Sequence, residues 1–132
     1  MAKSRPNSFE PRKPLENRER LLSFVYLGSF LDDWANLGLG ELDLEVLEKL
    51  IMDRPEVGVV VPGTGGLRKV RFASTKGHKG KSGSERVWYA LFPRPGLALM
   101  VTVFGKDDKD NLTAAERNAV KAMLTKYEAQ LS

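Results

Sequence analysis

The segment that decides the fold runs from Pro62 to Arg94, and its sequence is PGTGGLRKVRFASTKGHKGKSGSERVWYALFPR. Residues 67–73 and 86–92 each alternate between apolar and other side chains, which is the two-residue period of a β-strand. A loop rich in glycine and lysine separates them. A third, almost entirely apolar segment at 97–104 follows a short proline-containing turn and suits a central strand. The sequence therefore predicts three consecutive antiparallel strands.

The basic side chains of these strands are predicted to gather on one face of the sheet. Lys69 and Arg71 share a face of the first strand, Arg86 begins the second, and Lys106 directly follows the third. We expect these cations to converge on an open sheet face, with the helices on the other face. Like charges in neighbouring strands repel one another unless an anion binds among them. The cluster is therefore a candidate anion-binding site.

The flanking segments predict one more strand and three helices, from apolar spacing and from capping residues. These elements are a strand at 22–26, a helix at 30–37 after Ser29, a helix at 44–51 after Asp43, and a helix from Thr113-Ala-Ala-Glu116 to Leu131. The order is strand, helix, helix, three strands, helix. This order predicts an α+β fold in which helices pack on one face of a small antiparallel sheet.

The 132 residues fit one domain with a basic extension in front of it. Residues 1–20 carry three prolines, six cations and almost no large apolar side chains, so we expect a flexible tail. The folded domain is expected at 21–132. No run of about 18 apolar residues predicts a transmembrane helix, and the N-terminus lacks the pattern of a secretory signal. We therefore expect the protein in the cytoplasm, with no membrane contact.

The charges are strongly separated along the chain. Residues 21–60 hold eight acids against two cations, whereas residues 62–94 hold eight cations against Glu85 alone. Such a dense basic block indicates a polyanionic partner such as RNA or DNA. The chain has no cysteine and its single histidine is His78, which excludes thiolate catalysis, cysteine-based zinc sites and a histidine metal cluster. We expect no metal and no cofactor.

Three motifs allow competing interpretations. The glycines at 63–66 resemble a phosphate loop, but no GKS or GKT ending and no helix follows them, so a tight turn is the better interpretation. The loop at 75–84 either attracts phosphates through its lysines or is a solvated hairpin loop. Asp107, Asp108 and Asp110 either bind magnesium or, as we favour, form a solvated turn before the last helix.

Several motifs together resemble the RelE/HigB-type toxins of bacterial type II toxin–antitoxin modules, within the RelE/ParE superfamily. The resemblance covers about residues 22–131. The motifs that carry it are PGTGGLRKVRFA at 62–73, GK at 80–81, RVWY at 86–89, TVFGK at 102–106 and DNLTAAE at 110–116. Their order and spacing agree at once, which makes the resemblance more specific than the glycine run alone.

The resemblance implies a RelE-like fold and a ribosome-dependent mRNA endoribonuclease that needs no metal and inhibits translation and growth. In such enzymes the ribose 2′-OH attacks the adjacent phosphate. The expected catalytic residues are Arg86 at the scissile phosphate, Lys69 as general base, Arg71, and Lys106 as phosphate binder or leaving-group acid. The expected RNA-binding residues are Arg68, Lys76, Lys79 and Lys81.

The resemblance also implies partners. These are the ribosomal A site with mRNA and rRNA, and a cognate antitoxin of the helix-turn-helix HigA type, through which the complex would bind operator DNA. The sequence departs from the family pattern at Ser82, Ser84, Glu85, Ala90 and Phe104. Two alternatives stay open on the same fold: a non-catalytic RNA-binding or interaction module, and a ParE-like inhibitor of DNA gyrase.

Overall fold

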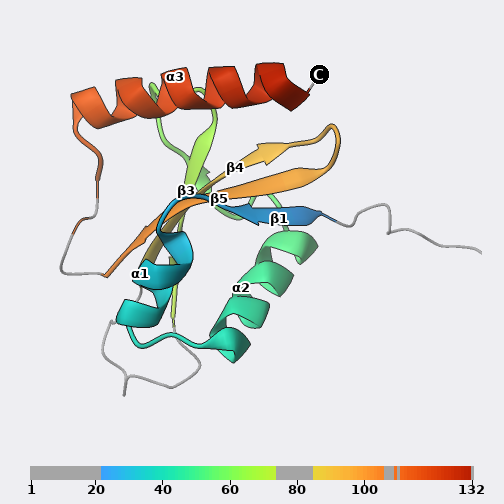
Figure 1. Ribbon diagram of the computed structural model, residues 1–132, viewed down its shortest axis with the longest axis vertical. Helices are drawn as coiled ribbons and strands as arrows, with labels where there is room; N and C mark the ends of the chain where they lie inside the picture. Colours follow the sequence, from blue (N-terminus) through green and yellow to red (C-terminus); the bar gives the residue numbers. More distant parts are fainter. Residues whose placement is uncertain (1–21, 74–84, 106–108, 110, 132) are drawn as a thin grey trace, which may run out of the picture.

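The computed structural model describes residues 22–73, 85–105, 109 and 111–131 of the chain (Figure 1). It contains three helices and a five-stranded sheet among these residues, so the predicted α+β class is confirmed. In chain order the elements are β1 (Ser23–Tyr26), α1 (Phe30–Asn36), α2 (Glu41–Asp53), β2 (Val59–Val60), β3 (Leu67–Phe72), β4 (Glu85–Phe92), β5 (Leu97–Phe104) and α3 (Ala114–Leu131).

The sheet has the strand order β1-β5-β4-β3-β2. The three strands predicted as an antiparallel set pair as expected, β3 with β4 and β4 with β5. Two features differ from the prediction. The two-residue strand β2 was missed, and β1 pairs with β5 in parallel, so the sheet is mixed. A parallel neighbour requires a long connection, and here residues 27–96, which include α1, α2 and three strands, connect β1 to β5.

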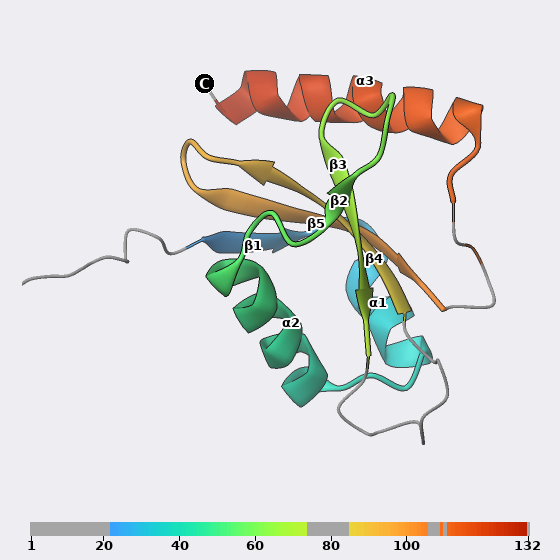
Figure 2. The same cartoon turned by 180° about the vertical axis from the view of Figure 1, so that it is seen from behind.

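The prediction that helices cover only one face of the sheet is wrong. Helices α1 and α2 lie on one face, and α3 crosses the other face (Figures 1 and 2). The physical reason lies in β3 and β4, where Leu67, Trp88 and Ala90 share the face that carries Arg86. Removing apolar surface from water stabilises the folded state by about 25 cal/mol per Å². Helix α3 covers these apolar side chains through Leu124.

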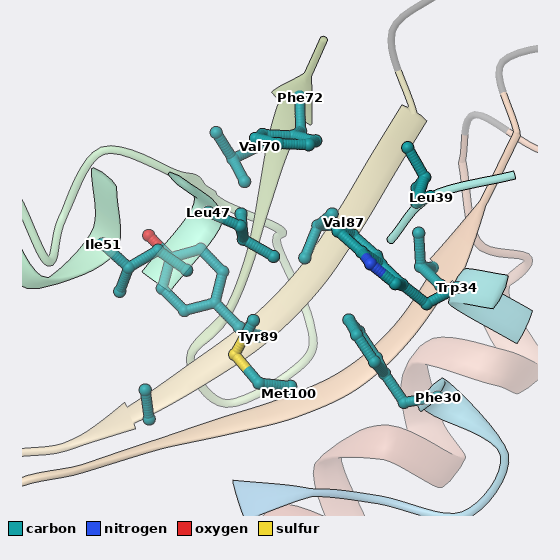
Figure 3. Close-up of a cluster of buried hydrophobic side chains, with 12 residues drawn as sticks. Phe30, Trp34, Leu39, Leu47, Ile51, Val70, Phe72, Val87, Tyr89 and Met100 are labelled. Atoms are coloured by element: carbon teal, nitrogen blue, oxygen red, sulfur yellow. The ribbon is translucent and has the colours of Figure 1, made fainter. Parts of the chain in front are cut away.

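The larger core fills the space between the sheet and the pair α1–α2. Phe30, Trp34 and Phe72 form a chain of ring contacts there, with ring centroids 5.9 and 5.6 Å apart (Figure 3). Leu47 and Ile51 of α2 complete this core and are fully buried. The layer fixes one face of β3 and β4, and therefore fixes which of their side chains point to the opposite face.

Local hydrogen bonds cap the first turns of α2 and α3. Asp43, expected as a cap, lies three residues inside α2 and accepts a hydrogen bond from the backbone N–H of Gly40 at 3.0 Å. The predicted capping box of α3 is confirmed. The backbone N–H of Thr113 donates to Glu116 at 2.8 Å, and that of Glu116 donates to Oγ1 of Thr113 at 3.1 Å.

Tyr89 ties the loop before β2 to the centre of the sheet. Its buried hydroxyl donates to the carbonyl oxygen of Pro55 at 2.7 Å and accepts from the backbone N–H of Gly58 at 2.9 Å. A Cβ on Gly58 would lie 2.7 Å from Cε1 of Tyr89, so only glycine allows this approach. Burial raises the pKa of Tyr89 and keeps the hydroxyl protonated.

Candidate functional site

The structure brings three of the predicted site residues together on neighbouring strands. Arg71 of β3 lies directly opposite Arg86 of β4, and Lys69 lies opposite Trp88, two residues further along β3. All three cations extend from the face that α3 partly covers. We call Lys69, Arg71 and Arg86 the cationic face.

The cationic face lies beyond the part of the sheet that α3 covers. The contacts of Leu124 fall on an apolar cluster that includes Leu67 at the start of β3 and Phe92 at the end of β4. The end of β3 and the start of β4, which carry Arg71 and Arg86, project away from α3 in both views (Figures 1 and 2). The expectation of a fully open face is therefore wrong, because α3 covers its apolar end.

The three cations differ in exposure. Arg86 is only 8% exposed, Lys69 is half-buried and Arg71 is exposed. Each of them also interacts with other groups of the protein. A buried guanidinium requires such partners, because an unpaired charge in the interior is costly. Arg86 is thus the buried member of the cluster and Arg71 the accessible one.

Lys69 is held against an aromatic ring and an amide. Its Nζ lies 5.9 Å from the ring centroid of Trp88 and 3.4 Å from Oδ1 of Asn111. The indole face attracts the ammonium, and the amide oxygen accepts from it. These contacts attach the segment before α3 to β3, on the same face as Arg86. Asn111 was not predicted, because nothing in the local sequence indicates that this segment returns to the sheet.

Phe104 borders the cationic face from β5. It lies opposite Arg86 in the strand pairing, and its ring meets Trp88 edge-on at 5.4 Å. Lys109 Nζ lies 5.7 Å from the Phe104 ring centroid and pairs with Glu116. The hydrogen bond from Lys109, with that from Thr113, lowers the pKa of Glu116. Lys109 is a further cation beside the face that the sequence analysis did not single out.

The other predicted residues fall into two groups. Arg68 lies on the opposite strand face, where its Nη1 donates to the carbonyl oxygens of Gly58 at 2.8 Å and Glu56 at 3.4 Å. The remaining cations lie outside the described residues, as do the predicted turn aspartates. These are Lys76, Lys79, Lys81, Lys106, Asp107, Asp108 and Asp110.

Two negative findings apply to the part of the chain that the structure describes. No group of three or more histidine, cysteine, aspartate or glutamate side chains there could hold a metal ion. No helix in that part is long and apolar enough to cross a membrane. A cluster of cations can bind a phosphate and stabilise charge that develops on it, which is the chemistry this arrangement offers.

Comparison with solved structures finds that the chain is similar to a free-state structure of the E. coli toxin RelE, in a mutant with two arginine-to-alanine changes. The two are 15% identical, the match covers 78% of this chain and 96% of that chain, and the TM-score is 0.49. No protein-family profile matches the sequence. The motifs and side-chain geometry of the chain itself, rather than this similarity, support the function proposed below.

Proposed function

We propose that this protein is the toxin component of a type II toxin–antitoxin module, and that it cleaves mRNA on the ribosome without a metal ion. The observation that carries the proposal is the placement of Arg86 opposite Arg71, with Lys69 on the same face. Guanidinium groups from two adjacent strands can bind different oxygens of one phosphate, and an arginine donates to phosphate through a planar fork. The sequence motifs at 62–73, 86–89 and 102–106 resemble the RelE/HigB-type toxins and support the same function.

In the proposed reaction the ribose 2′-oxygen attacks the adjacent phosphorus and the bond from phosphorus to the 5′-oxygen breaks. The products are a 2′,3′-cyclic phosphate and a free 5′-hydroxyl. Arg86 contacts the scissile phosphate and stabilises the extra negative charge of the transition state. A guanidinium suits this role, because it stays charged and can donate to two phosphate oxygens at once.

The proton transfers are assigned to lysines, since the only histidine is His78. Lys69 is proposed to lose its own proton to water and then, as a neutral amine, to accept the proton of the 2′-hydroxyl. Lys106 is proposed to bind the phosphate or to protonate the leaving 5′-oxygen. Arg71, exposed beside Arg86, is proposed to neutralise a second oxygen of the same phosphate. Arg68, Lys76, Lys79 and Lys81 are proposed to contact the backbones of mRNA and rRNA.

The proposed setting is the cytoplasm, with the ribosomal A site as the place of action. A cognate antitoxin, proposed to be of the helix-turn-helix type, would neutralise the protein by covering the cationic face or by blocking entry to the ribosome.

The test is induced expression of the wild type and Arg86→Ala in a bacterial host, with growth recorded and mRNA 5′ ends mapped. Wild type is expected to arrest growth and to cut translated messages in frame with codons. Arg86→Ala is expected to lower cleavage by about 10²- to 10³-fold, the usual loss for one transition-state donor. Arg54→Ala is the matched control, because Arg54 is an exposed arginine at the end of α2.

Arg86→Lys and thermal unfolding separate chemistry from folding. Arg86→Lys keeps the charge but loses the bidentate fork, so it is expected to fold and to retain only part of the activity. Growth arrest without mRNA cuts would contradict the nuclease function and favour inhibition of DNA gyrase. If soluble, folded wild type had no effect on growth or mRNA, the protein would be a non-catalytic binding module.

A further inference from the structure

Two cations on α3 lie beside the glycine-rich loop at 62–66. Arg117 and Lys121 are four residues apart, so they lie on the same side of the helix. The position of a Cβ on Gly63 would be 3.9 Å from Cδ and Nε of Arg117. The equivalent position on Gly65 would be 3.4 Å from Cγ of Lys121. The loop backbone therefore packs along the aliphatic stems of both cations, which leaves their charged ends at its rim.

The loop itself is held in one shape. Thr64 is fully buried, and its Oγ1 donates to the carbonyl oxygen of Val61 at 2.6 Å and accepts from the N–H of Leu67 at 3.0 Å. Gly63 and Gly65 have φ values of 79° and 76°, which residues other than glycine rarely adopt. The loop is therefore a fixed wall against which Arg117 and Lys121 are positioned, in agreement with its interpretation as a tight turn.

A short chain of contacts connects this wall to the cationic face. Arg117 Nη1 donates to the carbonyl oxygen of Leu112 at 3.1 Å. The neighbouring residue Asn111 lies 3.4 Å from Nζ of Lys69. One segment thus positions Arg117 on one side and Lys69 on the other. Along α3, Arg117 and Lys121 are about 6 Å apart, because four residues of helix rise by that distance.

We propose that Arg117 and Lys121 form a track that binds the phosphate backbone of single-stranded RNA and leads to Lys69 of the cationic face. We call Arg117 and Lys121 the backbone track. The inference rests on the proposed nuclease function, and it adds Arg117 and Lys121 as substrate-binding residues that hold the message on one side of the scissile phosphate. A positively charged groove that follows the backbone is the usual device for binding single strands without base specificity.

The charge distribution favours a polyanion on this side of the protein. Residues 30–53, which form α1 and α2, contain seven acids and one lysine. These helices lie on the opposite face of the sheet from α3. A polyanion is therefore repelled from the α1–α2 layer and attracted to the layer that holds the backbone track.

The test measures binding of a fluorescein-labelled oligouridine of about 12 nucleotides, long enough for one such groove, by fluorescence anisotropy at several salt concentrations. The variant is the full chain with Arg117→Gln and Lys121→Gln. Each lost phosphate contact on a single strand reduces the slope of log K against log salt by about 0.7, so the double change is expected to reduce it by about 1.4. At 0.1 M salt this corresponds to a loss of affinity of about 25-fold.

The matched control carries Lys126→Gln and Lys49→Gln. This control removes the same total charge from two exposed positions. Lys126 is nine residues from Arg117 on α3 and therefore lies on the opposite side of that helix. Lys49 lies on α2. Its slope and affinity are expected to stay close to wild type. Lys121→Gln alone serves as a second variant, because Lys121 is exposed and its change leaves the Arg117 hydrogen bond to Leu112 in place.

An equal loss in both double variants would mean that only net charge matters, and would overturn the backbone track. So would wild-type affinity and slope in the Arg117→Gln, Lys121→Gln protein. The nuclease proposal is decided separately by the mRNA cuts of the wild type. Salt-dependent binding through Arg117 and Lys121 without mRNA cuts would support the backbone track and contradict the nuclease function. Cuts by the wild type, together with unchanged RNA binding in the Arg117→Gln, Lys121→Gln protein, would support the nuclease function and contradict the backbone track.

Discussion

Tyr89→Phe is expected to destabilise the protein through two lost hydrogen bonds in its interior. The ring of Tyr89 is fully buried, its hydroxyl donates to Pro55 at 2.7 Å, and it accepts from Gly58 at 2.9 Å. Phenylalanine keeps the ring but leaves the buried N–H of Gly58 without its acceptor. An unsatisfied buried donor costs about 1–3 kcal/mol, and the lost bond to Pro55 adds about 1 kcal/mol. We therefore expect a loss of about 2–4 kcal/mol in the free energy of unfolding.

Urea denaturation followed by tryptophan fluorescence measures this loss. The midpoint should fall while the m-value stays constant, because the surface exposed on unfolding is unchanged. Tyr127→Phe is the control, since the contact of Tyr127 is ring packing on Phe92, with centroids 5.5 Å apart, and its cost should stay below about 0.5 kcal/mol. A Tyr89→Phe protein within about 0.5 kcal/mol of wild type would refute the role of the hydroxyl.

Two further predictions concern the same core and the helix across the sheet. Gly58→Ala should cost about 1–3 kcal/mol, and Tyr89→Phe should not rescue it, because the closest clash is with ring carbon Cε1 at 2.7 Å; urea denaturation of the double variant checks this. Leu124→Ala should cost about 2–4 kcal/mol, since Leu124 is the buried residue of α3, and loss of α3 amide protection in hydrogen exchange should accompany it.

The pH dependence of stability forms the last prediction of this group. Burial raises the folded-state pKa of both Tyr26 and Tyr89, and the hydrogen bond to Glu48 adds to the effect at Tyr26. A raised pKa means that the folded state keeps its proton longer, so stability is full below about pH 10 and falls as the pH rises above it. Urea midpoints at several alkaline pH values test this, and Tyr89→Phe should show a weaker decline than wild type.

The strands and their faces could be predicted from sequence because alternation is a strong local signal. Val70 and Phe72 point to one core, and Lys69 and Arg71 to the other face, as the alternation predicts. The hairpin placed Arg86 on the neighbouring strand, but its register with Arg71 came only from the structure. The α3 capping box was equally local, since its two hydrogen bonds join residues three apart.

The layer arrangement was not predicted, because it depends on which apolar face each helix finds. Trp88 and Ala90 share the strand face of Arg86, and this face changes from cationic to apolar along β4. The alternating pattern predicts on which face of the sheet each side chain lies. It does not predict that the two ends of one face differ, with cations at one end and apolar side chains at the other. The parallel pairing of β1 with β5 could not be predicted for a similar reason, because its partners, such as Ser23 and Leu97, are far apart in the sequence.

The partners of the cationic face depend on similarly distant contacts. Asn111 approaches Lys69 from 42 positions along the chain, and Arg117 approaches the loop at Gly63 from α3. No spacing rule relates such residues, because they meet only after α3 has crossed the sheet. Arg68 illustrates the converse, since it adjoins Lys69 in sequence and lies on the other strand face.

The parallel pairing of β1 with β5 also determines when this chain can fold during its synthesis. β1 is made first, yet the strand it pairs with begins at Leu97. Until that strand has left the ribosome, β1 lacks its neighbour and the core under α1 lacks Met100 and Val103. Contacts between such distant residues slow folding and keep early segments exposed. The nascent protein should therefore depend on chaperones and become resistant to protease only after β5 has emerged.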